Sequence, residues 1–201
     1  MRLLILIFAF LVHLNLMSQC YLSNTVRNGM HIEETTGNQG LDKILFEQKK
    51  SLESVFPVNV ELHFGVERSQ AGNAYFSSAC QSIYCNGEIV LGRFLMGELA
   101  KRSDSYLRLV SVFAHEYGHA MQHKYGWSGN GKWRELHADY LAGYYMGLCR
   151  LSSESEILSI FTEFASRGDF EFNSPSHHGT PEERSCAFIE GYKTAFIPNT
   201  N

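Results

Sequence analysis

The sequence has few prolines, no surplus of basic residues and no pair of cysteines spaced as Cys-x-x-Cys. Only four prolines occur in 201 residues and 44% of the residues are hydrophobic, which indicates a globular chain rather than a disordered one. The 17 basic and 21 acidic residues give a net charge of −4, and no long run of like charge is present, so nucleic-acid binding is not expected. The missing Cys-x-x-Cys spacing excludes the common cysteine-rich zinc sites. No internal repeat interrupts the chain, and its length predicts a single domain.

The one long apolar run lies at the N-terminus. It follows Arg2 and extends from Leu3 to Leu16 with two polar interruptions. A basic start and an apolar stretch of this length are typical of a secretory signal peptide, which we place at residues 1–19. The run is shorter than the roughly 20 apolar residues of a transmembrane helix. The sequence therefore predicts a protein that is secreted or held in the periplasm or cell envelope, with an uncleaved anchor or a lipid anchor at Cys20 as alternatives.

Export would permit disulfides among the five cysteines. Cys80 and Cys85 are five residues apart and could close a small loop. Cys149 and Cys186 could then form a second disulfide, or remain as buried thiols.

Hydrophobic periodicity predicts the elements that precede the middle of the chain. Residues 20–40 are polar and without pattern, which indicates a flexible lead-in to a domain at 41–201. A helix is predicted at 41–55, because apolar residues recur there at helical spacing, and alternation predicts a strand with one buried face at 58–66. A loop is expected at 67–82, and the turn signal Asn86-Gly87 predicts a hairpin at 83–92.

Helices dominate the second half of the predicted domain. The pattern becomes helical near Leu95, and we expect helices at 105–124, 133–150 and 153–166. The last helix is predicted to begin after Thr180. Thr180 is a favourable N-cap, Pro181 suits the first helical position and Glu183 completes a capping box.

The helix predicted at 105–124 contains His115-Glu116-Tyr117-Gly118-His119. Residues four apart lie on nearly the same helix face, so the two imidazoles can bind one zinc ion. Glu116 can then accept a proton from the water in the open coordination position of the zinc. A glycine inside a helix costs about 1 kcal/mol relative to alanine, so Gly118 indicates a close packing contact. The alternative is a pair of surface histidines on an amphipathic helix.

A catalytic zinc ion requires a third protein ligand, and the next helix offers Glu135 and Asp139 on one face. That face continues at Gly143 and Gly147, which would let the helix lie close to the HExxH helix. Glu135 has the longer reach and is the predicted ligand, whereas Asp139 is suited to accept a hydrogen bond from a ligand histidine. His137 is the competing ligand, although it points away from both carboxylates. The alternative for the carboxylates is a solvated helix start.

Two further features concern the substrate. His178 precedes the last helix and is a predicted catalytic residue, because a fixed donor stabilises the charge that develops on a carbonyl oxygen. Its alternative role is that of a loop histidine bonded to the backbone. Glu88–Leu91 is a candidate edge strand for a bound peptide, and the alternative is an ordinary strand of a small sheet.

Three segments, HEYGHAMQHKYG, ELHADYLAGYYMG and HGTPEERSCAFIEGY, resemble the neutral zinc metallopeptidases. These are zincins with an HExxH helix and a downstream Glu-x-x-x-Asp helix. The stretch NAYFSSACQSIYCNGEIVLG is similar to the cysteine-containing stretch that precedes the active-site helix in that family. The resemblance covers about residues 72–193, and the combined motifs are more specific than HExxH alone.

The resemblance implies a zincin-like α+β fold with a predominantly helical core and a small sheet beside the active-site helix. It implies that Zn²⁺ binds to His115, His119 and Glu135, with Glu116 as the general base and Asp139 supporting a ligand. We therefore expect a zinc metallopeptidase that acts on peptides or proteins. The alternatives are a catalytically silent zincin-fold binding protein and a zinc hydrolase of non-peptide amides. The sequence determines neither the cleavage preference nor the oligomeric state.

Overall fold

The computed structural model describes residues 30–66, 73–80, 82–101, 105–150, 156–157, 160 and 178–196. These residues form an α+β fold with a four-stranded sheet, which confirms the predicted class. The elements are β1 (His31–Glu33), α2 (Gln39–Val55), β2 (Glu61–Val66), β3 (Ala74–Ser77), β4 (Glu88–Gly92), α3 (Arg93–Ala100), α4 (Ser105–Lys124), α5 (Gly131–Leu148) and α7 (Pro181–Thr194). The predicted signal peptide, Cys20 and most of the helix predicted at 153–166 lie outside the described residues. No helix in the described part of the chain is both long and apolar enough to cross a membrane.

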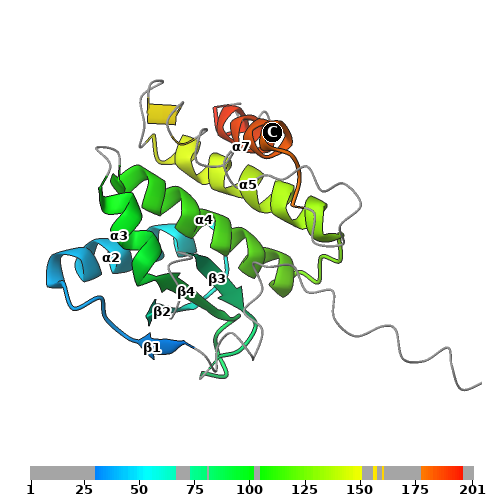
Figure 1. The fold of residues 1–201 in the computed structure, drawn as a ribbon. Coiled ribbons are helices and arrows are strands. Elements are labelled where there is room, and N and C mark those ends of the chain that lie inside the picture. Colours follow the sequence, from blue (N-terminus) through cyan, green and yellow to red (C-terminus); the bar gives the residue numbers. More distant parts are fainter. Residues whose placement is uncertain are drawn as a thin grey trace, which may run out of the picture.

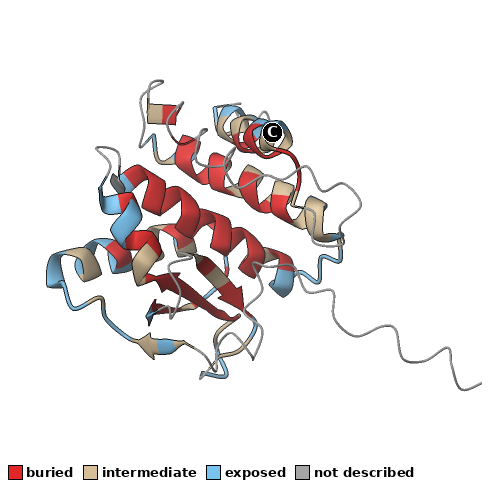
Figure 2. Cartoon of the chain, in the orientation of Figure 1, coloured by how far each residue is buried: buried red, intermediate tan, exposed pale blue. Residues whose placement is uncertain are grey.

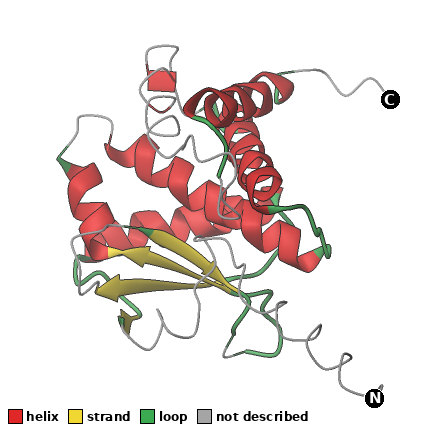
Figure 3. Cartoon of the chain, turned by 45° about the vertical axis from the view of Figure 1, so that its right-hand side comes forward, coloured by secondary structure: helices red, strands yellow, loops and turns green. Residues whose placement is uncertain are grey.

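The fold is built in layers. The sheet has the strand order β1-β2-β4-β3, in which β2 and β4 are parallel and the two outer pairs are antiparallel. The helices lie on one face of the sheet (Figure 3). Helix α4 lies next to the sheet, α5 packs on α4, and α7 packs on the far side of α5 (Figure 1). Helix α5 is therefore held between two other helices.

The two strands at the centre of the sheet are buried on both faces. β2 places Leu62 and Phe64 in the core beneath the helices, but His63 on the opposite face is also buried. The prediction of one buried face was therefore incomplete. Strand β2 pairs on both sides, and an interior strand loses contact with solvent more completely than an edge strand.

The sequence analysis did not predict two short strands. β1 lies within the segment predicted to be a patternless lead-in, and β3 lies within the predicted loop at 67–82. Residues 83–85 belong to a turn, so the predicted hairpin at 83–92 is wrong, and the antiparallel partner of β4 is β3. Glu88–Leu91 is consequently an internal strand, and β3 is the sheet edge beside α4.

Helix ends agree well with the local sequence signals. The Asn38 side chain caps α2, and the Asn130 side chain caps α5 by accepting from the Trp133 backbone N–H. The capping box of α7 is confirmed, because Thr180 Oγ1 accepts from the Glu183 backbone N–H at 3.2 Å and the Glu183 side chain accepts from the Thr180 N–H at 2.9 Å.

Helix α4 is buried along most of its length (Figure 2). Phe113 and Tyr117 contribute fully buried aromatic rings, and they meet edge to face with ring centroids 5.3 Å apart. They pack in the same hydrophobic core as Phe64 of β2 and Phe76 of β3. The HExxH segment thus lies in the interior, which excludes a pair of histidines on a solvent-facing helix surface.

Glycines allow α5 to approach both of its neighbours. A Cβ atom on Gly118 of α4 would lie 2.8 Å from the Ala138 Cα of α5, which confirms the close contact that this glycine predicted. Gly143 and Gly147, however, pack against α7 and not against the HExxH helix, because a Cβ on Gly143 would lie 1.9 Å from the Phe188 carbonyl oxygen. Each four-residue step along a helix advances about 40° beyond a full turn. The row of residues that faces α4 at Glu135 has therefore turned toward α7 by Gly143.

The described cysteines contain one disulfide. Cys80 and Cys85 are bonded, as their spacing suggested. Cys149 and Cys186 are free, and Cys186 is exposed, so the predicted alternatives of a second disulfide or of two buried thiols do not hold for this pair.

The contact at Gly143 yields a stability prediction. Gly143→Ala is expected to lower the free energy of unfolding by about 3 kcal/mol, because the new methyl group meets a backbone carbonyl that can move only with all of α7. Gly97→Ala in α3 is the matched control. No atom lies within 4 Å of its added Cβ, so we expect this variant to be stabilised by about 0.5–1 kcal/mol. Urea unfolding measures both values, and equal effects of the two substitutions would contradict the close packing of α5 and α7.

Candidate metal centre

Helix α4 provides two histidines that face α5. His115 and His119 are 5% and 1% exposed, and their ring centroids lie 4.8 Å apart with the rings nearly perpendicular. Their spacing of four residues places them on one face of the helix, as the sequence predicted. Both side chains are held within the interior and not at the protein surface.

Glu135 of α5 points between these two rings. Its Oε2 lies 3.4 Å from His115 Nε2, and its Oε1 lies 3.5 Å from His119 Nε2. One ligand atom from each of the three residues lies within 4.8 Å of the other two. The three predicted ligands are therefore brought together, and this group could hold a metal ion.

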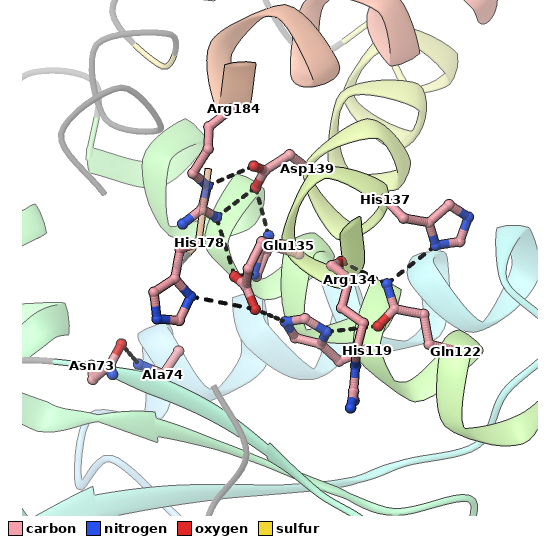
Figure 4. Close-up of polar contacts among 11 residues, drawn as sticks. Asn73, Ala74, His119, Gln122, Arg134, Glu135, His137, Asp139, His178 and Arg184 are labelled. Atoms are coloured by element: carbon pink, nitrogen blue, oxygen red, sulfur yellow. Dashed lines mark hydrogen bonds and ion pairs between the residues drawn. The ribbon is translucent and has the colours of Figure 1, made fainter. Parts of the chain in front are cut away.

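Asp139, one turn after Glu135, supports His115 from behind. Its Oδ1 lies 2.8 Å from His115 Nδ1, which is within hydrogen-bonding distance. Arg184 of α7 donates two hydrogen bonds to the same carboxylate, from Nε to Oδ2 at 2.7 Å and from Nη2 to Oδ1 at 2.8 Å. Arg184 Nη2 also lies 3.5 Å from Glu135 Oε2, so one guanidinium contacts both carboxylates (Figure 4). Both carboxylates are fully buried, which excludes the solvated helix start.

His119 has a different support. Its Nδ1 lies 3.0 Å from Oε1 of Gln122, a residue that the sequence analysis did not select. Gln122 follows His119 by three residues, one helical turn, and this spacing was the available signal. The involvement of Arg184 with the ligand group had no comparable local signal, because 45 residues separate it from Asp139.

Burial and neighbouring groups set the charges of these residues. Burial lowers the pKa of His119 to about 4, so its ring is neutral near pH 7. Burial opposes ionisation of Glu135, but interactions with His119, His115 and His178 outweigh it and hold the pKa of Glu135 well below its usual range. Burial also opposes ionisation of Asp139, whose pKa is lowered by Arg184 and His115. Two buried carboxylates are thus ionised, and the guanidinium of Arg184 lies beside both of them.

The other predicted residues lie at different distances from the group. Glu116, next to His115 on α4, is 2% exposed. His178 lies before α7, and its Nδ1 is 3.8 Å from Glu135 Oε1, which places its ring at the ligand group. His137 points away from Glu135 (Figure 4) and stacks on Trp127 with ring centroids 5.0 Å apart. His137 is therefore not the third residue of the ligand group.

The donor set fits a cation. Asp139 can only accept, so its contact favours a proton on Nδ1 of His115 and leaves Nε2 as an electron-pair donor. His119 Nε2 is buried and has no hydrogen-bond partner among the described residues. Two nitrogen lone pairs and a carboxylate converge, and a bound cation would offset their mutual repulsion.

Comparison of the chain with models of protein families, with curated proteins and with solved structures finds no match to any of them. The interpretation of the site therefore rests on its own residues and their geometry.

The contact between Asp139 and His115 predicts a loss of metal affinity. Asp139→Ala is expected to weaken the affinity of the group for a divalent metal ion, with zinc as the probe, on the order of 10–100-fold, because His115 loses the acceptor that orients its ring. Competition with a chromophoric chelator measures the affinity. Asp139→Asn keeps the shape and an acceptor oxygen, so it serves as a second variant if the unpaired Arg184 prevents the alanine variant from folding. Asp42→Ala, in the first turn of α2, is the control. Unchanged affinity in both Asp139 variants would remove this residue from the site.

The lowered pKa of His119 predicts how metal-free stability depends on pH. Below pH 6.5 the unfolded chain binds a proton at this position that the folded protein does not bind until about pH 4. The free energy of unfolding should therefore fall as the pH decreases from 6.5 to 4. Urea unfolding in the presence of a chelator measures this slope, which should be shallower in His119→Gln. The exposed His31 provides the control, His31→Gln. A slope that His119→Gln leaves unchanged would contradict the assignment of a neutral, buried ring.

Proposed function

We propose that the protein is a zinc-dependent peptidase. The observation that supports this most directly is that His115, His119 and Glu135 lie together, with one ligand atom from each within 4.8 Å of the other two. The buried Glu116 follows His115 directly in the sequence of α4. Two neutral imidazoles and one carboxylate are a donor set that zinc favours, and three protein ligands leave a coordination position open. When bound, zinc would act as a Lewis acid and lower the pKa of a coordinated water to about 7.

Two residues of the chain would provide the general base and the hydrogen-bond donor of the reaction. Glu116 accepts a proton from the water that attacks the peptide carbonyl carbon, and it delivers that proton to the departing amine. His178 donates a hydrogen bond to the carbonyl oxygen as negative charge develops there. The position of His178, 3.8 Å from Glu135, supports this role because it brings the ring to the ligand group.

The edge of the sheet supports a peptide substrate. β3 is one of the two outer strands and packs against α4, the helix that carries Glu116. An extended peptide can add to such an edge through backbone hydrogen bonds. At the start of this strand the Ala74 N–H donates to Asn73 Oδ1 at 3.0 Å (Figure 4), and a peptide that pairs there would replace this side-chain contact.

We also propose that the peptidase acts outside the cytoplasm. The apolar run Leu3–Leu16 supports export, and the disulfide between Cys80 and Cys85 is of the kind that persists in oxidising compartments. A lipid anchor at Cys20 is the alternative to release after export.

The proposed activity can be tested with a diverse peptide library. Zinc-loaded protein is expected to cleave members of the library, as read by mass spectrometry. Glu116→Gln should retain the metal and lose activity on the order of 10²–10⁴-fold, because it removes the general base but none of the ligands. Metal content of both proteins, measured by mass spectrometry, separates this effect from loss of zinc.

Three outcomes would count against the proposal. Cleavage that Glu116→Gln leaves unchanged would indicate a contaminating protease. No cleavage by wild-type protein that holds one zinc per chain would favour a catalytically silent binding protein. Cleavage of non-peptide amides but of no peptide would favour a zinc hydrolase that acts on non-peptide amides.

A further inference from the structure

Gln122 connects the metal centre to a part of α5 that does not itself bind metal. The residue is 2% exposed and lies on α4 one turn beyond His119. Its amide group contacts His119 on one side, and the Arg134 carbonyl and His137 on the other (Figure 4). None of these contacts follows from the HExxH motif.

The contacts determine which way the amide faces. Gln122 Nε2 donates to the Arg134 carbonyl oxygen at 2.7 Å, and a carbonyl oxygen can only accept. The same nitrogen lies 3.2 Å from His137 Nδ1. The amide nitrogen therefore faces α5, and the amide oxygen faces His119. Since Oε1 can only accept, the proton in its contact with His119 belongs to the ring Nδ1.

We propose that Gln122 is the positioning residue of His119, which it holds in the Nδ1–H tautomer so that Nε2 presents its lone pair to the cation. This inference rests on the metal-binding part of the proposed function, and not on peptide hydrolysis. It assigns different supports to the two histidines, a carboxylate for His115 and an amide for His119.

A competing tautomer explains why His119 needs this support. Without Gln122, the ring keeps its polar contact with Glu135, whose Oε1 lies 3.5 Å from Nε2. An ionised carboxylate favours a proton on the nitrogen that faces it, so the ring would protonate at Nε2 and pair with Glu135. His119 and Glu135 would then be hydrogen-bonded to each other, and neither would be available to bind the cation. The acceptor at Nδ1 opposes this, because a neutral imidazole carries only one ring proton.

The support of His119 depends on the docking of α5. Arg134 precedes the ligand Glu135 by one residue and His137 follows it by two, and both contact the Gln122 amide. The His137 ring is itself restrained by stacking on Trp127. The same turn of α5 therefore delivers the third ligand and orients the second.

The test compares Gln122→Met with Gln122→Glu in the full-length chain. Methionine has similar length and offers only a weak acceptor, whereas glutamate keeps an oxygen acceptor for His119. Gln122→Met is expected to weaken zinc affinity on the order of 10–100-fold in a chelator competition. Gln122→Glu is expected to weaken it less, because it keeps the acceptor for His119 although it loses the donor to the Arg134 carbonyl. Nitrogen-15 NMR of the metal-free protein should show His119 protonated at Nδ1 in wild type and shifted toward Nε2 in Gln122→Met.

Gln48→Met is the matched control, since the amide of Gln48 also bonds to two side chains, the hydroxyls of Tyr106 and Tyr145, but lies on α2. It should change neither zinc affinity nor the His119 tautomer. Unchanged affinity and tautomer in Gln122→Met would overturn the proposal. Equal loss of affinity in both Gln122 variants would also overturn it, because the acceptor oxygen would then not be the cause. Failure to cleave peptides would refute the peptidase but leave these two readouts intact.

Discussion

Glu135 and Asp139 bring two ionised carboxylates into the interior, one helical turn apart on α5. An interior charge is tolerated only where it is paired and hydrogen-bonded, and the rest of the helical layer satisfies that requirement. Arg184 of α7 pairs with Asp139 and approaches Glu135 from one side, while the histidines of α4 approach from the other. The positions of three helices are thus tied to the burial of two side chains.

Close approach of the helix backbones makes this pairing geometrically feasible. Gly118 of α4 lies against Ala138, and Gly143 of α5 lies against the Phe188 carbonyl of α7. Larger residues at the two glycines would move the helices apart, and the carboxylates would lose their partners. Packing of small residues and pairing of charges are therefore one constraint, since neither can be relaxed without loss of the other.

Contacts outside the ligand group hold its two histidines in place. Each histidine has a specific acceptor on the ring nitrogen that faces away from Glu135, which orients both rings toward the carboxylate. Loss of such a contact to a ligand histidine typically lowers metal affinity by about 10–100-fold. The partner of His115 comes from α5 directly, and the partner of His119 comes from α4 but is held by α5. Docking of α5 consequently positions all three residues of the group that could hold a metal ion.

The amino-acid sequence by itself determined the features that depend on residues within one or two helical turns. These include the shared face of His115 and His119, the shared face of Glu135 and Asp139, the capping box at Thr180 and the α+β class. Tertiary structure alone decided what each face meets: the glycines of α5 meet α7, β3 and not β4 forms the sheet edge, and Gln122 meets the turn that carries Glu135. The physical reason is that periodicity specifies the direction of a side chain relative to its own helix or strand. The neighbour in that direction is set by packing between segments far apart in the chain, which no local pattern encodes.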